Sequence, residues 1–433
     1  MYSPETYRPR ILDKKIDLYL SAVGALLIEG PKWCGKTTTG EAHSKSEISL
    51  ADSSNNFSNR KLAQASPDFV LKGELCRLID EWQEVPQIWD AVRFACDEDN
   101  QCGKFILTGS SLASVRKDEI FHSGTGRIAS LTLQSMTLYE TGDSNGSVSL
   151  QDLFDGTVEP MPTGKVEIEE LVRYCVRGGW PKSIDTPMAA ATITPLQYIT
   201  KVIEEDYNSL PEVGRKRDVA KVRAVVEALA HFESTNAGLT DYSNYIRENT
   251  GISLGRQTVP SYVDGLKKLF VLYDQPAFTL LSNQTGSKIL KSVKTRFSDP
   301  SLAIAALRYT PESLLRDMDT FSRFFDCLCV HDLKIYAESS DATIYHLAEE
   351  HGTTADSLIR LNDGRIGCFK HVVASVDITK AIQQLSRVKK ILTNAGKECA
   401  LLCVVCGMAD AVYKKTTPDG DDVYIVPLTA LKP

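Results

Sequence analysis

The sequence predicts an α/β protein whose N-terminal part is a parallel β-sheet with helices on both faces. Short apolar runs alternate there with longer segments of helical character, as in parallel strands joined by crossover helices. A glycine-rich turn follows the first run and an acidic pair ends the third, which is where open α/β sheets place their ligand sites. The predicted strands lie near residues 24–29, 46–50, 75–80, 104–109 and 128–133.

The turn after the first strand has the spacing of a phosphate-binding loop. It reads GPKWCGKT, so that a glycine, four residues and then Gly-Lys-Thr follow in order. Glycines let successive N–H groups point at phosphate oxygens, and the following helix adds the positive end of its dipole. Lys36 is expected to reach the β- and γ-phosphates and Thr37 to bind Mg²⁺. We therefore predict ATP and Mg²⁺ as ligands, with nucleotide-binding residues Gly30, Pro31, Lys32, Trp33, Cys34, Gly35, Lys36, Thr37 and Thr38.

An acidic pair, Asp80 and Glu81, ends the predicted strand near 75–80. On its own such a pair is more often a solvated surface feature. Its place directly after an apolar run favours a catalytic site instead. In that site Asp80 and Thr37 hold Mg²⁺, and Glu81 orients the attacking water.

Two further residues are candidates for contacts with the reacting phosphate. Ser110 follows the fourth strand and is predicted to hydrogen-bond the γ-phosphate or the attacking water; the alternative is a simple turn at Gly109. Arg127 precedes the fifth strand and is predicted to neutralise the developing charge, either in cis or from a neighbouring subunit of a homo-oligomer. The alternative for Arg127 is a structural salt bridge.

The order of these motifs resembles that of a known family. GPKWCGKT, LIDEWQ, ILTGSS, GTGRI, MTLYE and VRGGWP occur in sequence, and TRFSDPSLAIAAL, FFDCLCVHDLKIYA and VYIVPLTALKP continue the likeness to the C-terminus. The chain resembles the AAA-type (P-loop) ATPases of bacteria and archaea that carry a C-terminal domain of unknown function. The resemblance implies a P-loop ATPase core in residues 1–160.

The same resemblance implies a restriction-endonuclease-like α/β domain in residues 276–433. The pattern of that fold has an acidic residue and then Glu-x-Lys on the next strand. Asp356 fits the acidic residue, but the Glu-x-Lys positions hold either Lys370 and Val372 or, in a register shifted by two, Cys368 and Lys370. The second carboxylate is missing in both registers, and hard divalent metals require clustered oxygen ligands. We therefore expect this domain to be catalytically inactive.

Two helical units are predicted between these domains, a lid or connector in residues 161–214 and a winged-helix-like unit in 215–275. The second unit reads as helix, turn with Gly251, helix and apolar strand. A packing role is the alternative to DNA binding, because Pro260 stands early in the second helix and the nearby charge is mixed. If the unit reads DNA, the expected contacts are Arg256, Gln257, Ser261 and Lys267.

Composition narrows the class of protein. With 433 residues, 42% apolar and 24% charged, the chain is expected to form two or three soluble domains. No apolar run approaches the roughly 20 residues that span a bilayer, and the first residues are polar and charged, so we expect no membrane contact and a cytoplasmic location. The net charge of −7 argues against DNA binding through a broad positively charged surface.

Three functions follow from these observations. The first is a slow ATPase that uses Mg²⁺ and drives or gates the interaction of the C-terminal domains with a partner. The second is a nucleotide-gated regulator that binds DNA or protein with little turnover. The third and least favoured is an ATP-dependent nuclease, because the Glu-x-Lys pair is lost.

Overall fold

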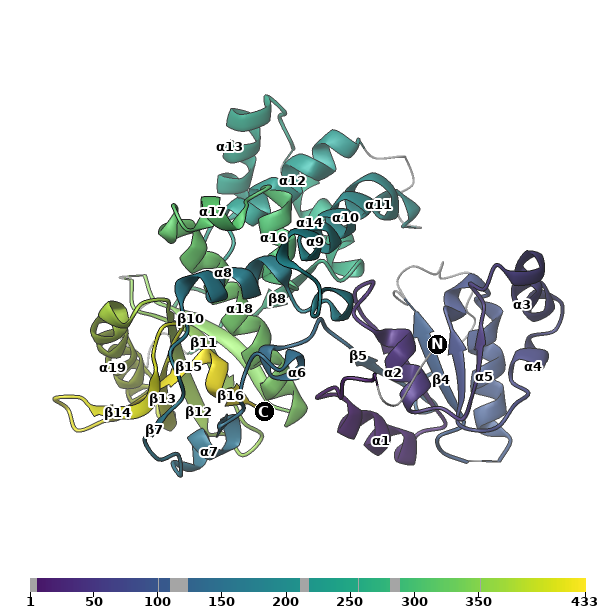
Figure 1. Cartoon of the computed structure of the whole chain (residues 1–433), viewed down its shortest axis with the longest axis horizontal. Helices are drawn as coiled ribbons and strands as arrows, with labels where there is room; N and C mark the ends of the chain where they lie inside the picture. Colours follow the sequence, from purple (N-terminus) through teal and green to yellow (C-terminus); the bar gives the residue numbers. More distant parts are fainter. Residues whose placement is uncertain are drawn as a thin grey trace.

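The computed structural model describes residues 6–99, 101–109, 124–210, 218–255, 257–280, 289–350 and 352–433. Figure 1 shows the N-terminal domain, with α1 to α5 and β1 to β5, to one side of the remaining helices and strands.

The N-terminal domain is the predicted α/β layer structure. Within the described residues its five strands are all parallel, in the order β2-β3-β4-β1-β5. Successive side chains of a strand face opposite sides, so a sheet buried on both faces needs continuous apolar runs. Leu26 and Ile28 accordingly pack against α1, whereas Ala25 and Leu27 belong to the core beneath α5. The strands are β1 (Ala25–Glu29), β2 (Ser46–Ser49), β3 (Arg77–Asp80), β4 (Phe105–Gly109) and β5 (Ile128–Thr132), and the helices are α1 (Asp13–Ala22), α2 (Lys36–Ala42), α3 (Ser54–Ala65), α4 (Pro67–Val70) and α5 (Gln87–Asp97).

The chain after β5 crosses to the C-terminal domain and joins its sheets. Helix α6 (Leu138–Thr141) is followed by β6 (Val148–Ser149), which pairs with β16 (Leu431–Lys432). After α7 (Leu150–Asp155), β7 (Met161–Pro162) pairs with β14 (Ala411–Thr416). Of these strands, β6 falls within the residues 1–160 predicted as ATPase core, yet it pairs with the C-terminal strand β16; β7 falls at the start of the predicted connector in 161–214. Two-residue strands have no periodicity that a sequence could reveal.

A mainly helical region connects the two sheets. It includes three helices, α12, α13 and α14, and an antiparallel pair of strands, β8 and β9; the winged-helix-like unit in residues 215–275 stays a prediction. Arg256, one of its predicted DNA contacts, lies outside the described residues. The elements are α8 (Ile168–Arg177), α9 (Met188–Ala191), α10 (Ile193–Lys201), a π-helical turn (Val202–Asp206), α11 (Tyr207–Ser209), α12 (Val219–His231), α13 (Leu239–Thr250), α14 (Thr258–Lys268), β8 (Leu272–Gln275), β9 (Lys294–Phe297), α16 (Pro300–Ala306) and α17 (Pro311–Leu314).

The C-terminal domain is a mixed sheet between two long helices. Its described strands run in the order β10-β11-β12-β13-β15-β14-β7. The buried helix α18 packs on one face and α19 on the other (Figure 1). The elements are α18 (Met318–Ser339), β10 (Thr343–Ala348), β11 (Thr354–Arg360), β12 (Ile366–Val372), α19 (Ile378–Asn394), β13 (Cys399–Cys406) and β15 (Asp422–Pro427). Every helix in the described ranges is too short or too polar to cross a bilayer.

Candidate functional site

The loop between β1 and α2 has the curvature that phosphate binding requires. Gly30 and Gly35 have φ of 148° and 102°, in the range that glycine adopts readily. A Cβ at Gly30 would lie 2.1 Å from the carbonyl oxygen of Leu133, so the neighbouring chain also excludes a side chain there. Both glycines are therefore needed for the backbone conformation, and Gly30 also for close packing.

Lys36 is held inside this loop. Lys36 is the first residue of α2 and is 7% exposed. Its Nζ donates hydrogen bonds to the carbonyl oxygens of Gly30 (3.0 Å) and Pro31 (2.8 Å). The ammonium group thus lies where the loop closes on itself, and phosphate oxygens can replace the two carbonyl acceptors.

Asp80 lies beside Thr37, as predicted for a metal pair. Thr37 Oγ1 donates to Asp80 Oδ1 (2.8 Å), as does Thr108 Oγ1 (2.7 Å), and Ser49 Oγ donates to Oδ2 (3.1 Å). These residues come from the C-terminal ends of β2, β3 and β4 and from the start of α2. A carboxylate and a hydroxyl are oxygen donors of the kind Mg²⁺ prefers, so the residues present fit that ion. The contribution of Ser49 was not predicted, because nothing in the sequence shows that β2 lies beside β3.

Glu81 directly follows β3 and has left-handed backbone (φ 54°). Burial raises the pKa of its carboxyl group, and the charges of Asp80 and Glu84 add to this effect. A hydrogen bond from Gln83 Nε2 to Oε2 and the charge of Lys36 act in the opposite direction. A carboxylate with a raised pKa beside the phosphate loop is suited to accept a proton.

Arg127 and Ser110 are not placed beside the loop. Ser110 lies outside the described residues. Arg127 precedes β5, whose first residue Ile128 pairs with Ala25 at the start of β1, whereas the phosphate loop follows the end of β1. Its Nε donates to Asp97 Oδ1 (2.6 Å), and the side chain is 51% exposed. Arg127 and the phosphate loop of the same chain therefore lie at opposite ends of the strands. This arrangement does not provide the predicted cis contact, and a role in trans stays a prediction.

Two contacts join the exposed tip of the phosphate loop to the helical region. Lys32 Nζ donates to Asp206 Oδ1 (2.6 Å), and the ring of Trp33 packs edge-on against Tyr198 with 5.7 Å between centroids. We call these two contacts the loop latch. Asp206 and Tyr198 lie on the π-helical turn and on α10, in the predicted lid, so the latch connects the loop to another domain.

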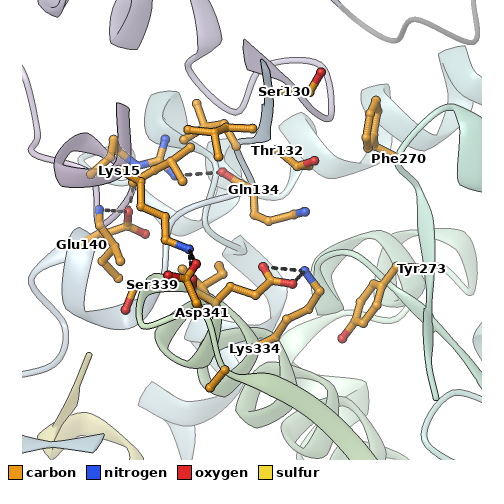
Figure 2. Close-up of a pocket in the computed structure, with 18 of the residues that line it drawn as sticks. Lys15, Ser130, Thr132, Gln134, Glu140, Phe270, Tyr273, Lys334, Ser339 and Asp341 are labelled. Atoms are coloured by element: carbon orange, nitrogen blue, oxygen red, sulfur yellow. Dashed lines mark hydrogen bonds and ion pairs between the residues drawn. The ribbon is translucent and has the colours of Figure 1, made fainter. Parts of the chain in front are cut away.

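Arg10, which precedes α1, also contacts the phosphate loop. This residue is 6% exposed and donates through Nη1 to the carbonyl oxygen of Cys34 (2.9 Å). Arg10 lines a cavity of about 560 Å³ between the N-terminal domain and α18. Figure 2 shows Gln134 and Glu140 on one side of this cavity and Lys334 and Asp341 on the other.

A second polar cluster lies in the C-terminal domain. Asp326, Asp356 and His371 form one group in the described residues with ligand atoms within 4.8 Å of one another. Asp356 Oδ1 accepts from Lys370 Nζ (2.6 Å), and Asp326 is paired with Arg296 Nη1 (2.9 Å) and His371 Nδ1 (2.6 Å). Both carboxylates therefore already have cationic or hydrogen-bonding partners.

The residues at the two candidate glutamate positions lie on β12, beside the strand of Asp356. Leu358 pairs with Cys368, and Lys370 contacts Asp356. Neither Cys368 nor Lys370 supplies the missing carboxylate. Cys368 is buried among apolar side chains, and the expected inactivity of this domain stays a prediction.

Comparisons with known proteins agree with the geometry of the N-terminal domain. Residues 23–142 match the family model described as an AAA domain. The N-terminal domain is a P-loop domain of the AAA type. Residues 168–313, beyond this AAA domain, match a domain of unknown function (DUF8612). No curated protein matches the sequence.

Several solved structures are similar to this chain over part of its length. A Walker-type ATPase of Pyrococcus abyssi is 13% identical, with 71% of this chain and 97% of that chain covered and a TM-score of 0.42. The Aeropyrum pernix Orc1 protein in complex with DNA is 13% identical (72% and 96% covered, TM-score 0.26). The Thermotoga maritima RuvB Holliday junction branch migration motor is 17% identical (64% and 90% covered, TM-score 0.27).

Proposed function

We propose that this chain is a slow ATPase that hydrolyses ATP with Mg²⁺ and uses its nucleotide state to gate contact with a partner. The observation that carries the proposal is the hydrogen bond between Thr37 and Asp80 beside the buried ammonium of Lys36. A hydroxyl, a carboxylate and a lysine at the mouth of a glycine loop form the arrangement that binds a metal–triphosphate complex.

Each residue has a role in this proposal. Lys36 exchanges its two carbonyl acceptors for β- and γ-phosphate oxygens, and Thr37 and Asp80 hold Mg²⁺, which when bound neutralises phosphate charge. Glu81 orients the attacking water and accepts its proton. Arg127, at the opposite edge of the sheet, acts in trans in a homo-oligomer; ATPase activity that rises with protein concentration beyond proportionality supports this arrangement.

The gating part of the proposal is supported by the loop latch. Lys32 and Trp33 belong to the loop that holds the phosphates, and both contact the helical region directly. A change in the loop on nucleotide binding therefore acts on that region without an intermediate element. The partner, DNA or protein, is proposed to contact the helical and C-terminal domains.

The direct test is calorimetric titration of ATP with Mg²⁺ into the full-length protein. Saturable heat with a stoichiometry of one nucleotide per chain is expected, followed by slow release of phosphate. A folded protein that gives no heat and no nucleotide-dependent thermal shift contradicts the proposal. Binding with no turnover favours the second function, a nucleotide-gated regulator.

Asp206→Asn is expected to raise the affinity for ATP two- to fivefold. The substitution removes a negative charge from beside the phosphate loop and frees Lys32, and exposed ion pairs contribute about 0.2–1 kcal/mol. The measurement is the Kd of ATP. The difference in tryptophan emission between wild type and Trp33→Phe reports separately on the loop latch. Asp185→Asn is the control, because it removes an exposed carboxylate that pairs with Arg8. An unchanged Kd in Asp206→Asn would show that the latch and the nucleotide are not coupled.

A further inference from the structure

Arg10 occupies a position that no motif indicates. Its guanidinium group is buried and donates in three directions, to the carbonyl oxygens of Cys34 (2.9 Å) and Gln134 (2.8 Å) and to Glu140 Oε1 (3.0 Å). The carbonyl of Cys34 belongs to the peptide that leads into Gly35 and Lys36. Arg10 thus holds the last turn of the phosphate loop through a backbone carbonyl oxygen.

The chemistry of this contact is specific to arginine. A planar guanidinium carries five N–H donors in a fixed fork, whereas a lysine ammonium is a point charge on a flexible stem. Burial by itself lowers the pKa of Arg10, but the charge of Glu140, the hydrogen bond to Glu140 and the nearby Cys34 and Tyr7 together outweigh burial, and the pKa is raised. The group therefore stays charged, and its hydrogen bonds are charge-assisted.

The far side of this contact is anchored on α18. Glu140 Oε1 also accepts from the backbone N–H of Ile11 (2.8 Å), and Glu140 forms a capping box with Thr137 at the start of α6. The N–H of Leu138 in the same helix donates to Asp332 Oδ2 (3.0 Å) on α18. Figure 2 shows Glu140 and Gln134 near one another in the wall of the cavity. The loop is thereby tied through Arg10 to a buried helix of the C-terminal domain.

We propose that Arg10 is a positioning residue for nucleotide binding, which fixes the Cys34–Gly35 peptide so that the loop N–H groups stay aimed at the phosphates. The inference rests on the proposed function. Gly35 has φ of 102° and no side chain to restrain it, so the hydrogen bond to the preceding carbonyl limits how that peptide can rotate. Because Arg10 contacts a carbonyl oxygen of the loop, it acts through the backbone.

The test is Arg10→Lys in the full-length protein, with ATP affinity and steady-state kinetics measured beside thermal unfolding. We expect KM and Kd for ATP to rise about tenfold and kcat at saturating ATP to fall less than threefold, because the loop contacts serve the bound substrate and the transition state alike. A purely structural residue would lower the unfolding temperature and the active fraction but leave KM unchanged. Folded Arg10→Lys protein with wild-type KM overturns the inference.

Two further variants keep the test decisive. Arg8→Lys, in the same N-terminal segment, alters an exposed ion pair with Asp185 and is expected to keep wild-type KM. If Arg10→Lys does not fold, Glu140→Gln retains an oxygen acceptor for Arg10 and Ile11, and KM is expected to rise two- to fivefold; an unchanged KM there overturns the inference. Wild-type protein that binds no ATP would instead overturn the proposed function.

Discussion

Lys36→Ala is expected to lower the affinity for ATP about a hundredfold. The lysine supplies charge-assisted hydrogen bonds to two phosphates, each contributing about 1.5–3 kcal/mol, and nothing else in the described loop replaces the buried ammonium. The fold should persist, because within the described residues the hydrogen bonds of Lys36 Nζ go to the carbonyl oxygens of Gly30 and Pro31, which belong to the loop itself. The measurement is calorimetric titration of ATP with Mg²⁺ at equal protein concentration.

Thermal unfolding gives an independent readout of the same change. ATP at a hundredfold excess over Kd stabilises the wild-type protein by about 2.7 kcal/mol, and this stabilisation should nearly disappear in Lys36→Ala. Lys61→Ala, an exposed lysine on α3 of the same domain, is the control and should keep the full shift. Wild-type affinity in Lys36→Ala would mean that this glycine loop is not the nucleotide site.

The fold of the N-terminal domain was predictable because its signals are local. Most of the strands are short, mainly apolar runs, although β2 reads SEIS, and sites in open parallel sheets gather at the C-terminal ends of the strands. Lys36, Thr37 and Asp80 follow such ends, which is why the structure brings them together as predicted. Ser49 follows the same rule but needs the strand order, which sequence alone does not provide.

The same rule applied to Arg127 gives a different result from the one predicted. Arg127 precedes its strand, whereas the phosphate loop follows β1. In a parallel sheet, a residue before one strand and a residue after another lie at opposite edges. The cis alternative conflicts with this geometry, while the trans alternative depends on subunits that one chain does not specify.

Contacts between distant segments were not predictable. Arg10 and Glu140 are 130 residues apart; Glu140 ends the MTLYE segment, but nothing in the sequence pairs it with Arg10. Asp326 and His371 likewise meet only because α18 packs on β12. A single sequence contains no signal for such pairs, since burial and pairing arise from tertiary packing.

Glu81→Gln is expected to leave ATP binding within about twofold of wild type and to reduce turnover roughly 10²–10⁴-fold. Glutamine keeps the size of the side chain and an oxygen acceptor, but it does not take up a proton, and general-base catalysis contributes a factor of this size. The paired measurement is the Kd of ATP by calorimetry and kcat by phosphate release.

The pH dependence distinguishes a base from a structural carboxylate. A general base acts in its deprotonated form, so kcat rises as pH increases through its pKa. Because burial raises the pKa of Glu81, this rise should occur at higher pH than for an ordinary glutamate, and the residual activity of Glu81→Gln should lack it. Glu84→Gln is the matched control: its carboxylate pairs with Arg60 and helps to raise the pKa of Glu81. Glu84→Gln should therefore keep kcat at neutral pH and move the rise to lower pH. A pH profile that is unchanged in Glu81→Gln would assign the proton transfer to another group.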